Sequence, residues 1–113
     1  MSQHRKHRGY ATQRIVADYL AERGWPHAYA IGAGESGDDI QGAVDIAVEV
    51  KARRGFDPQA AIRQMQARRG SALPFAVLRM DGTGETTLDD WPVVIRLADM
   101  VAVLRDAGYG SDE

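Results

Sequence analysis

The sequence predicts an α/β fold with a mixed central β-sheet flanked by helices, and three patterns support this prediction. Apolar residues recur at helical spacing over residues 10–23, as in an amphipathic helix. They alternate with other residues over 44–51, a period of two that is typical of a β-strand with one apolar face. The continuous apolar run at 75–78 indicates a strand buried on both faces. With 113 residues, the chain has room for one hydrophobic core and a single domain.

The composition excludes several classes of protein. Hydrophobic residues make up 44% and charged residues 27% of the chain, as in ordinary soluble globular proteins. The absence of cysteine excludes disulfides and thiolate zinc sites, and His4, His7 and His27 form only a weak metal-binding set. No apolar run approaches the roughly 18 residues of a membrane span, and no signal peptide is recognisable. We therefore expect a cytoplasmic protein.

The first half of the chain is expected to hold a helix and three short strands. Residues 1–8 are polar and basic, and we expect a flexible arm there. The helix over 10–23 follows and ends at a glycine. A Trp-Pro turn then leads into a strand at 27–31. A short segment over 39–42, closed by a glycine, precedes the alternating strand at 44–51.

The second half is expected to hold two helices and two strands. A helix over 57–69 begins with Asp-Pro, since Asp is a preferred N-cap and Pro suits the first helical position. A buried strand at 74–80, an acidic loop to residue 90 and a last strand at 93–97 follow. The final helix, 99–107, is expected to bury its apolar side chains, so that the element order is αβββαββα. These side chains are Met100, Val101 and Leu104.

The net charge of −2 conceals a segregation of charge along the chain. Residues 1–14 carry four basic side chains and no acidic one, and residues 51–69 carry six basic side chains against one acidic. Residues 70–113 carry three basic against eight acidic side chains. Because nucleic acids respond to the local potential, the basic segments favour a nucleic-acid partner. Solvated charged faces without a partner are the simpler alternative.

The alternating strand carries the residues that point to chemistry. Successive side chains of a strand point to opposite faces, so Glu49 and Lys51 are expected side by side on the non-apolar face. Asp39 precedes Glu49 by ten residues, and a hairpin through Gly42 would bring it back beside Glu49. Two carboxylates and a lysine would then converge, which suits a hard divalent cation and an activated water. Asp45 lies on the same face and is a competing ligand, while a solvated strand edge is the simpler alternative.

Asp39, nine intervening residues and then Glu49-Val50-Lys51 resemble the active-site motif of the PD-(D/E)XK nuclease superfamily. The chain is similar to the small Holliday junction resolvase-like and phage-encoded members, from about residue 8 to residue 109. The resemblance implies a restriction-endonuclease-like core and a Mg²⁺ ion, for which Mn²⁺ substitutes, held by Asp39, Glu49 and the Val50 carbonyl. It also implies that Lys51 orients the attacking water and balances charge in the transition state.

Three glutamines are candidate auxiliary residues by the same resemblance. Related nucleases commonly place a glutamate on the first helix, and Gln13 stands at the matching position here. Gln13 can accept a hydrogen bond or hold a water but brings no charge, so the metal site would rely on Asp39 and Glu49. Gln64 resembles the glutamine that many of these nucleases carry after the motif, with Gln66 as its rival. Exposed helical glutamines are the simpler alternative for all three.

Contacts with DNA phosphates are expected from basic side chains and from the Gly/Ser loop at 32–37, whose backbone N–H groups can approach a phosphate. Such contacts set affinity and do not read sequence. The loop contains no Gly-Lys-Ser/Thr, so that a nucleotide-hydrolysing P-loop is unsupported. The candidate DNA-binding residues are Arg8, Arg14, Ser36, Arg53, Arg54, Arg63, Arg68 and Arg69.

These observations lead us to expect a structure-specific endonuclease from a bacterium or a phage-infected cell. The chain is too small for a separate sequence-reading domain, which favours recognition of branched DNA. A four-way junction presents two equivalent phosphates across a two-fold axis, so we expect a homodimer formed through the strand at 75–80 or the final helix. A general phage nuclease and a non-catalytic DNA-binding or assembly module, which Gln13 favours, are the alternatives. A small structural protein with a polar sheet face is a remoter one.

Overall fold

The computed structural model describes residues 3–31, 39–52, 57–68 and 70–112, with the backbone alone at residues 3–8 and 68. The elements follow the expected order, with an additional 3-10 helix between the last two strands. They are α1 (Gln3–Ala21), β1 (Tyr29–Ala30), β2 (Ile40–Gln41), β3 (Ile46–Lys51), α2 (Pro58–Arg68), β4 (Leu73–Leu78), η1 (Glu85–Asp90), β5 (Val93–Val94) and α3 (Leu97–Asp106).

The main sheet is mixed and has the strand order β3-β4-β5. β3 and β4 are parallel, with Ile46 opposite Leu73 and Lys51 opposite Leu78, and β5 is antiparallel to β4. Parallel strands need a crossover connection, and α2 supplies it here. β1 and β2 form a separate two-stranded antiparallel sheet beside β3. The prediction of an α/β fold with a mixed sheet is confirmed, although the strands divide between two sheets.

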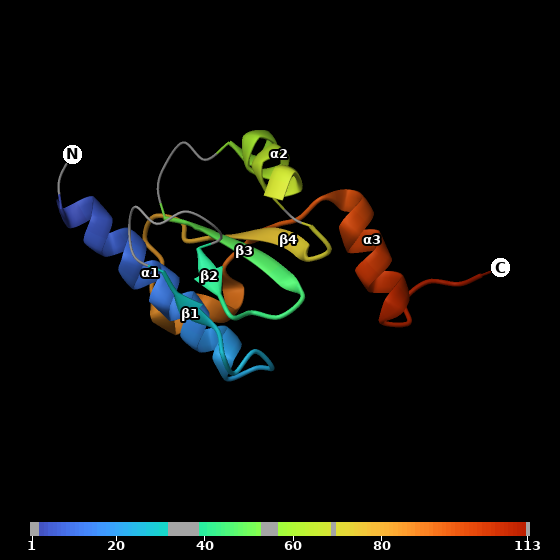
Figure 1. Ribbon diagram of the computed structural model, residues 1–113, viewed down its shortest axis with the longest axis horizontal. Coiled ribbons are helices and arrows are strands. Elements are labelled where there is room, and N and C mark those ends of the chain that lie inside the picture. Colours follow the sequence, from blue (N-terminus) through green and yellow to red (C-terminus); the bar gives the residue numbers. More distant parts are fainter. Residues whose placement is uncertain (1–2, 32–38, 53–56, 69, 113) are drawn as a thin grey trace.

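The two longer helices cover opposite faces of the main sheet (Figure 1). α1 packs on the face that carries Val48, Val50 and Val77, and α2 packs on the face that carries Ala76. The α2 N-terminus is capped as expected, because Asp57 Oδ1 accepts the Ala60 N–H at 3.1 Å. The largest core cluster consists of Val16, Ala17, Leu20, Ile40, Val48, Val50, Val77 and Trp91.

α1 begins earlier than predicted and takes in most of the expected flexible arm. Its helical backbone starts at Gln3, so only residues 1 and 2 of the arm lie outside the described residues. The segment contains no proline, its first glycine is Gly9, and Gln, Lys and Arg are good helix formers. The basic segment is therefore an extension of the helix. None of the helices in the described ranges is long and apolar enough to cross a membrane.

β3 begins later than predicted and is buried on both faces. The expected strand began at Val44, but Val44 is 67% exposed and the ladder starts at Ile46. Asp45 has a φ of 70°, a left-handed conformation that interrupts an extended strand. Ala47 is 6% and Glu49 7% exposed, so the face that is not apolar is covered as well. The alternating pattern therefore located the strand but not the burial of its polar face.

α3 stands apart from the core, contrary to the prediction that it buries its apolar side chains. Val101 is 49% and Leu104 40% exposed, Met100 is half-buried, and Asp99 is the buried residue of this helix. Figure 1 shows α3 beyond the edge of the sheet, with α2 and not α3 covering the adjacent sheet face. The helical pattern was correct, but its apolar stripe has no surface of the same chain to pack on within the described residues.

Candidate active site

Asp39 lies at the outer edge of β3, where it accepts a hydrogen bond from the strand backbone. β3 is an end strand of the main sheet, and the carbonyl oxygens of Asp45 and Lys51 accept hydrogen bonds from the β4 side. Because the backbone groups of alternate residues point to opposite edges of a strand, the N–H and C=O of Val50 point away from β4. Asp39 Oδ2 accepts this N–H at 2.7 Å. The Asp39 carboxylate and the Val50 carbonyl therefore lie on the same edge of the sheet.

Glu49 and Lys51 lie on the face of β3 that points away from α1. Val48 and Val50 pack in the core cluster with α1, so the residues between and after them point to the other face. Lys51 Nζ lies 3.3 Å from Glu49 Oε2, and the Glu49 side chain is 9% exposed against 24% for Lys51. A buried carboxylate requires a cation or hydrogen-bond donors nearby, and Lys51 supplies the cation. The prediction that these two side chains lie side by side is confirmed.

The oxygen atoms at this edge suit a hard divalent cation. Asp39 is bonded to the backbone of Val50, the residue that directly follows Glu49. Carboxylate and backbone carbonyl oxygens are ligands that Mg²⁺ and Mn²⁺ accept. The described residues hold no group of three or more His, Cys, Asp or Glu side chains placed to bind an ion. An ion here would complete its coordination with the Val50 carbonyl, water and a substrate phosphate, as Mg²⁺ commonly does.

Gln13 is half-buried on the α1 surface that faces the sheet, next to the fully buried Thr12. The Gln13 Oε1 atom is buried and has no hydrogen-bond partner among the described residues. A water molecule bound at a polar site can satisfy such an acceptor. The structure thus gives Gln13 an unmet acceptor, while its auxiliary role in the site stays a prediction.

The remaining predicted residues fall into three groups. On α2, Gln64 is exposed and Gln66 half-buried, and the helix packs through Ala61 and Met65 onto the sheet, so the choice between the two glutamines stays open. Arg14 and Arg63 are exposed, as side chains that contact DNA must be. Outside the described side chains lie Arg8, Ser36, Arg53, Arg54, Arg68 and Arg69.

The structure separates Asp45 from the other candidate ligands. Asp45 directly precedes β3 and is exposed, whereas Asp39 contacts Val50 near the far end of the strand. At about 3.3 Å per strand residue, roughly 16 Å separates the backbones of Asp45 and Val50. Asp45 is therefore no longer a competitor for the same ion.

Arg79 is a residue of this region that the sequence analysis missed. It follows β4, and its backbone N–H donates to the Lys51 carbonyl at 2.8 Å. Its side chain reaches α1, where Nη1 donates to Thr12 Oγ1 at 3.0 Å. A lone arginine after an apolar strand has no distinguishing pattern, although the register of two parallel strands would have brought it beside Lys51.

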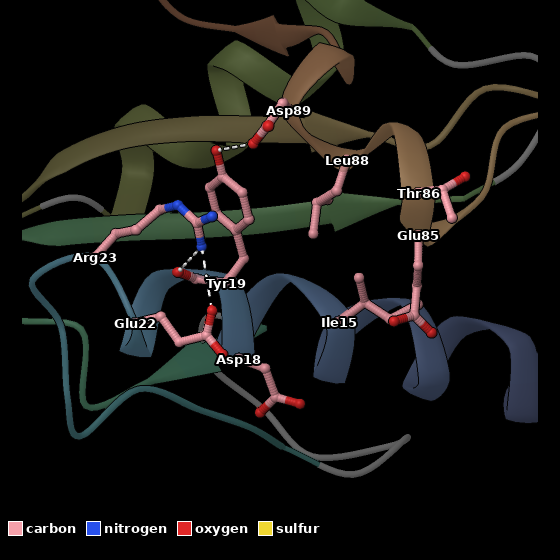
Figure 2. Close-up of a pocket in the computed structure, with 9 residues that line it drawn as sticks. All are labelled: Ile15, Asp18, Tyr19, Glu22, Arg23, Glu85, Thr86, Leu88 and Asp89. Carbon is pink, nitrogen blue, oxygen red and sulfur yellow. Dashed lines mark hydrogen bonds and ion pairs between the residues drawn. The ribbon is translucent and has the colours of Figure 1, made fainter.

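A groove of about 290 Å³ lies elsewhere, between α1 and η1 (Figure 2). Tyr19 donates a hydrogen bond to Asp89 at 2.8 Å, which raises the pKa of the Tyr19 phenol, and Arg23 stacks on the Tyr19 ring at 3.7 Å. The acidic lining repels phosphates, so we assign the groove no part in DNA binding. Its carboxylates are those of Asp18, Glu22, Glu85 and Asp89.

Comparisons of the chain with protein-family models, with curated proteins and with solved structures find no match. Function is therefore inferred from the residues and from the geometry at the edge of β3.

Proposed function

We propose that the chain is a Mg²⁺-dependent endodeoxyribonuclease that hydrolyses phosphodiester bonds in branched DNA, in the manner of the Holliday junction resolvase-like PD-(D/E)XK nucleases that its motif resembles. The observation that carries this proposal is the position of Asp39. Its carboxylate accepts the Val50 N–H at 2.7 Å, and Val50 stands in sequence between Glu49 and Lys51, whose side chains lie 3.3 Å apart. This contact supports the proposal, because the motif requires Asp39 to lie close to the two charged residues of β3.

Asp39, Glu49 and the Val50 carbonyl would hold the ion, with Mn²⁺ as a substitute for Mg²⁺. When bound, the ion supplies Lewis-acid stabilisation of negative charge on the scissile phosphate. The hydrogen bond from Val50 holds the Asp39 carboxylate in one orientation before any ion arrives. Such preorganisation removes part of the cost of assembling the site.

Lys51 supports two tasks in this proposal. Its ammonium group lies 3.3 Å from Glu49 and so holds that carboxylate in place. An ammonium group has three N–H donors, and those not directed at Glu49 can orient the attacking water and approach a phosphate oxygen. Positive charge at this position stabilises the negative charge that builds up in the transition state.

The proposed enzyme acts as a homodimer. Of the two candidate surfaces, the strand over residues 75–80 coincides largely with β4, the central strand of the main sheet, which has neighbours on both edges. α3 instead presents Val101, Leu104 and Leu97 to solvent. These features favour α3 as the surface that contacts a second copy.

Two observations favour a second candidate function, a non-catalytic DNA-binding or assembly module. Gln13 replaces an expected glutamate, and the described residues hold no group of three or more candidate ligand side chains.

To distinguish the two functions, purified protein should be incubated with Mg²⁺ and labelled duplex, single-stranded, flapped and four-way DNA. We expect cleavage that is strongest on the four-way junction and is lost in EDTA. Binding without cleavage under all these conditions would support the module, and equal cleavage of duplex and junction would support a general nuclease.

A further inference from the structure

Arg79 lies at the carboxyl-terminal end of β4, next to the end of β3 that carries Lys51. Its N–H donates to the Lys51 carbonyl at 2.8 Å, so the two residues end neighbouring parallel strands. Lys51 lies opposite Leu78 in the register. Because side chains alternate, Arg79 points to the α1 face of the sheet, whereas Lys51 points to the other face. The carboxyl ends of adjacent parallel strands are where α/β proteins commonly bind ligands.

Neutral groups alone hold the Arg79 guanidinium within the described part of the chain. Nη1 donates to Thr12 Oγ1 at 3.0 Å and Nε donates to the Thr83 carbonyl at 3.3 Å. The guanidinium carbon lies 5.5 Å from the centre of the Trp91 ring. Thr12 is 0% and Trp91 7% exposed, so the charge sits against a dry surface. No carboxylate of the described residues forms an ion pair with it.

The N–H donors of Arg79 that do not bond to Thr12 or Thr83 can bind an anion from outside the chain. A guanidinium has five N–H donors, and two of them make the hydrogen bonds to Thr12 and Thr83. A half-buried charge without an opposite charge is costly, so such groups are usually paired. The planar fork of a guanidinium fits two oxygen atoms of a phosphate group.

We propose that Arg79 binds a backbone phosphate of the DNA strand that reacts at Lys51. This inference rests on the proposed nuclease function and adds a binding residue to it. Thr12, Thr83 and Trp91 fix the guanidinium before DNA arrives, so that little side-chain entropy is lost on binding. Arg79 therefore positions the DNA strand across the carboxyl-terminal ends of β3 and β4, and it lies outside the basic segments of the sequence.

The test compares Arg79→Gln and Arg79→Lys with Arg23→Gln. Arg23 is a matched control because it also stacks on an aromatic ring, Tyr19, but lines the acidic groove. Affinity for a four-way junction is measured in EDTA over a range of salt concentrations. We expect Arg79→Gln to weaken binding about tenfold and to reduce the slope of log K against log salt by about one, because one phosphate contact is lost. Arg79→Lys should keep the slope, and Arg23→Gln should change neither quantity.

A thermal unfolding curve for each variant separates binding from stability. If Arg79→Gln lowers Tm but has the same affinity for DNA and the same salt slope as the wild type, Arg79 only stabilises the fold and the inference is overturned. In that case cleavage by the wild-type protein still supports the nuclease function.

Binding of inorganic phosphate can be measured as a second test that does not depend on nuclease activity. Because the Arg79 guanidinium lies over Trp91, phosphate binding should alter tryptophan fluorescence in the wild type and not in Arg79→Gln. If the wild-type protein neither binds nor cleaves DNA, the proposed function fails. If phosphate then changes the fluorescence of the wild type and not that of Arg79→Gln, the anion site at Arg79 is supported without the nuclease function. If phosphate does not change the fluorescence of the wild type, the anion site is overturned as well.

Discussion

At the scale of single residues, the proposed chemistry depends on carboxylates that are held by the backbone and by a lysine. Asp39 accepts the Val50 N–H at 2.7 Å, and Glu49 lies 3.3 Å from Lys51. Each contact fixes the orientation of an oxygen atom without consuming the whole carboxylate, which has room for about four hydrogen bonds or ligands. The variants that test the site must therefore remove charge and keep shape.

Asp39→Asn and Glu49→Gln should each reduce Mg²⁺-dependent cleavage at least about a hundredfold, because a neutral amide oxygen is a weaker ligand for a divalent ion. In the Asp39→Asn variant the amide oxygen can still accept the Val50 N–H, so the fold and the affinity for DNA in EDTA should be retained. Single-turnover cleavage, circular dichroism and a binding assay measure these three properties. Full activity in both variants would contradict the assignment of the site.

Asp45→Asn is the matched control for these two variants. Asp45 is exposed at the start of β3, away from the Val50 edge, so the substitution should leave cleavage within about twofold of the wild type. If Asp45→Asn loses as much activity as Asp39→Asn, the wrong aspartate has been assigned to the ion.

Part of this site could be predicted from the sequence, and part of it could not. Alternation along the strand predicted that Glu49 and Lys51 share a face. The hairpin predicted through Gly42 does not pair β2 with β3, because β2 pairs with β1, yet Asp39 still contacts β3 at the Val50 N–H. The burial of Glu49 was not predictable, because alternation cannot tell a covered polar face from a solvated one. Arg79 was missed because its place beside Lys51 comes from strand register, a contact between segments distant in sequence.

At the scale of elements, the β1–β2 hairpin positions Asp39. Ala30 pairs with Ile40, and the Ile31 N–H donates to the Asp39 carbonyl at 3.2 Å, which extends the ladder by one residue. Ile40 is 2% exposed and anchors the hairpin in the core. Gly42 closes this segment with a φ of 76° in contact with the His27 backbone. The site therefore depends on a turn that only glycine fits.

Gly42→Ala should destabilise the protein by at least about 2 kcal/mol, because a side chain at positive φ is strained and its Cβ would overlap the His27 carbonyl. Urea denaturation measures the change in the free energy of unfolding. Gly84→Ala is the control, since Gly84 has a φ of −136° and nothing within 4 Å of its Cβ position. Equal stability of the two variants would show that the turn does not constrain the hairpin.

Element boundaries show where propensity and packing decide different things. α1 was predicted from residue 10, where the apolar pattern begins, but helix propensity carries it back to Gln3. β3 was predicted from residue 44, but the left-handed Asp45 delays it to Ile46. Periodicity locates the buried part of an element, while its ends depend on local backbone preferences.

At the scale of the whole molecule, the described chain is elongated, with extents of 55 × 29 × 29 Å. Its radius of gyration of 14.7 Å exceeds the value of about 13 Å expected for a compact chain of this length. α3 contributes to this shape, since it lies beyond the sheet in Figure 1 with most of its side chains exposed. A sequence pattern predicts that a helix has an apolar stripe, but it does not say whether the same chain covers it.

The stripe on α3 has the form of a surface for a second copy of the same helix. Leu97, Val101 and Leu104 recur at spacings of four and three residues, so they lie along one side of the helix. Their exposed fractions are 77%, 49% and 40%. Two copies related by a two-fold axis perpendicular to the helices pair antiparallel, which opposes the two helix dipoles and buries each stripe against the other. The same symmetry would supply the two active sites that paired cuts in a four-way junction require.

Val101→Glu combined with Leu104→Glu should convert the proposed dimer to a monomer, because burying carboxylates in an apolar interface is costly. Ala102→Glu is the matched control, since Ala102 is exposed on the same helix but off the stripe, and it should leave the dimer intact. Light scattering at micromolar concentration measures the mass, and cleavage mapping on a fixed junction shows whether both strands are cut symmetrically. Neither Val101 nor Leu104 belongs to a core cluster of the described residues, so Tm of the monomeric variant at low concentration should match that of the wild type. A wild-type protein that is monomeric and cuts duplex as readily as the junction would contradict both the dimer and the preference for branched DNA.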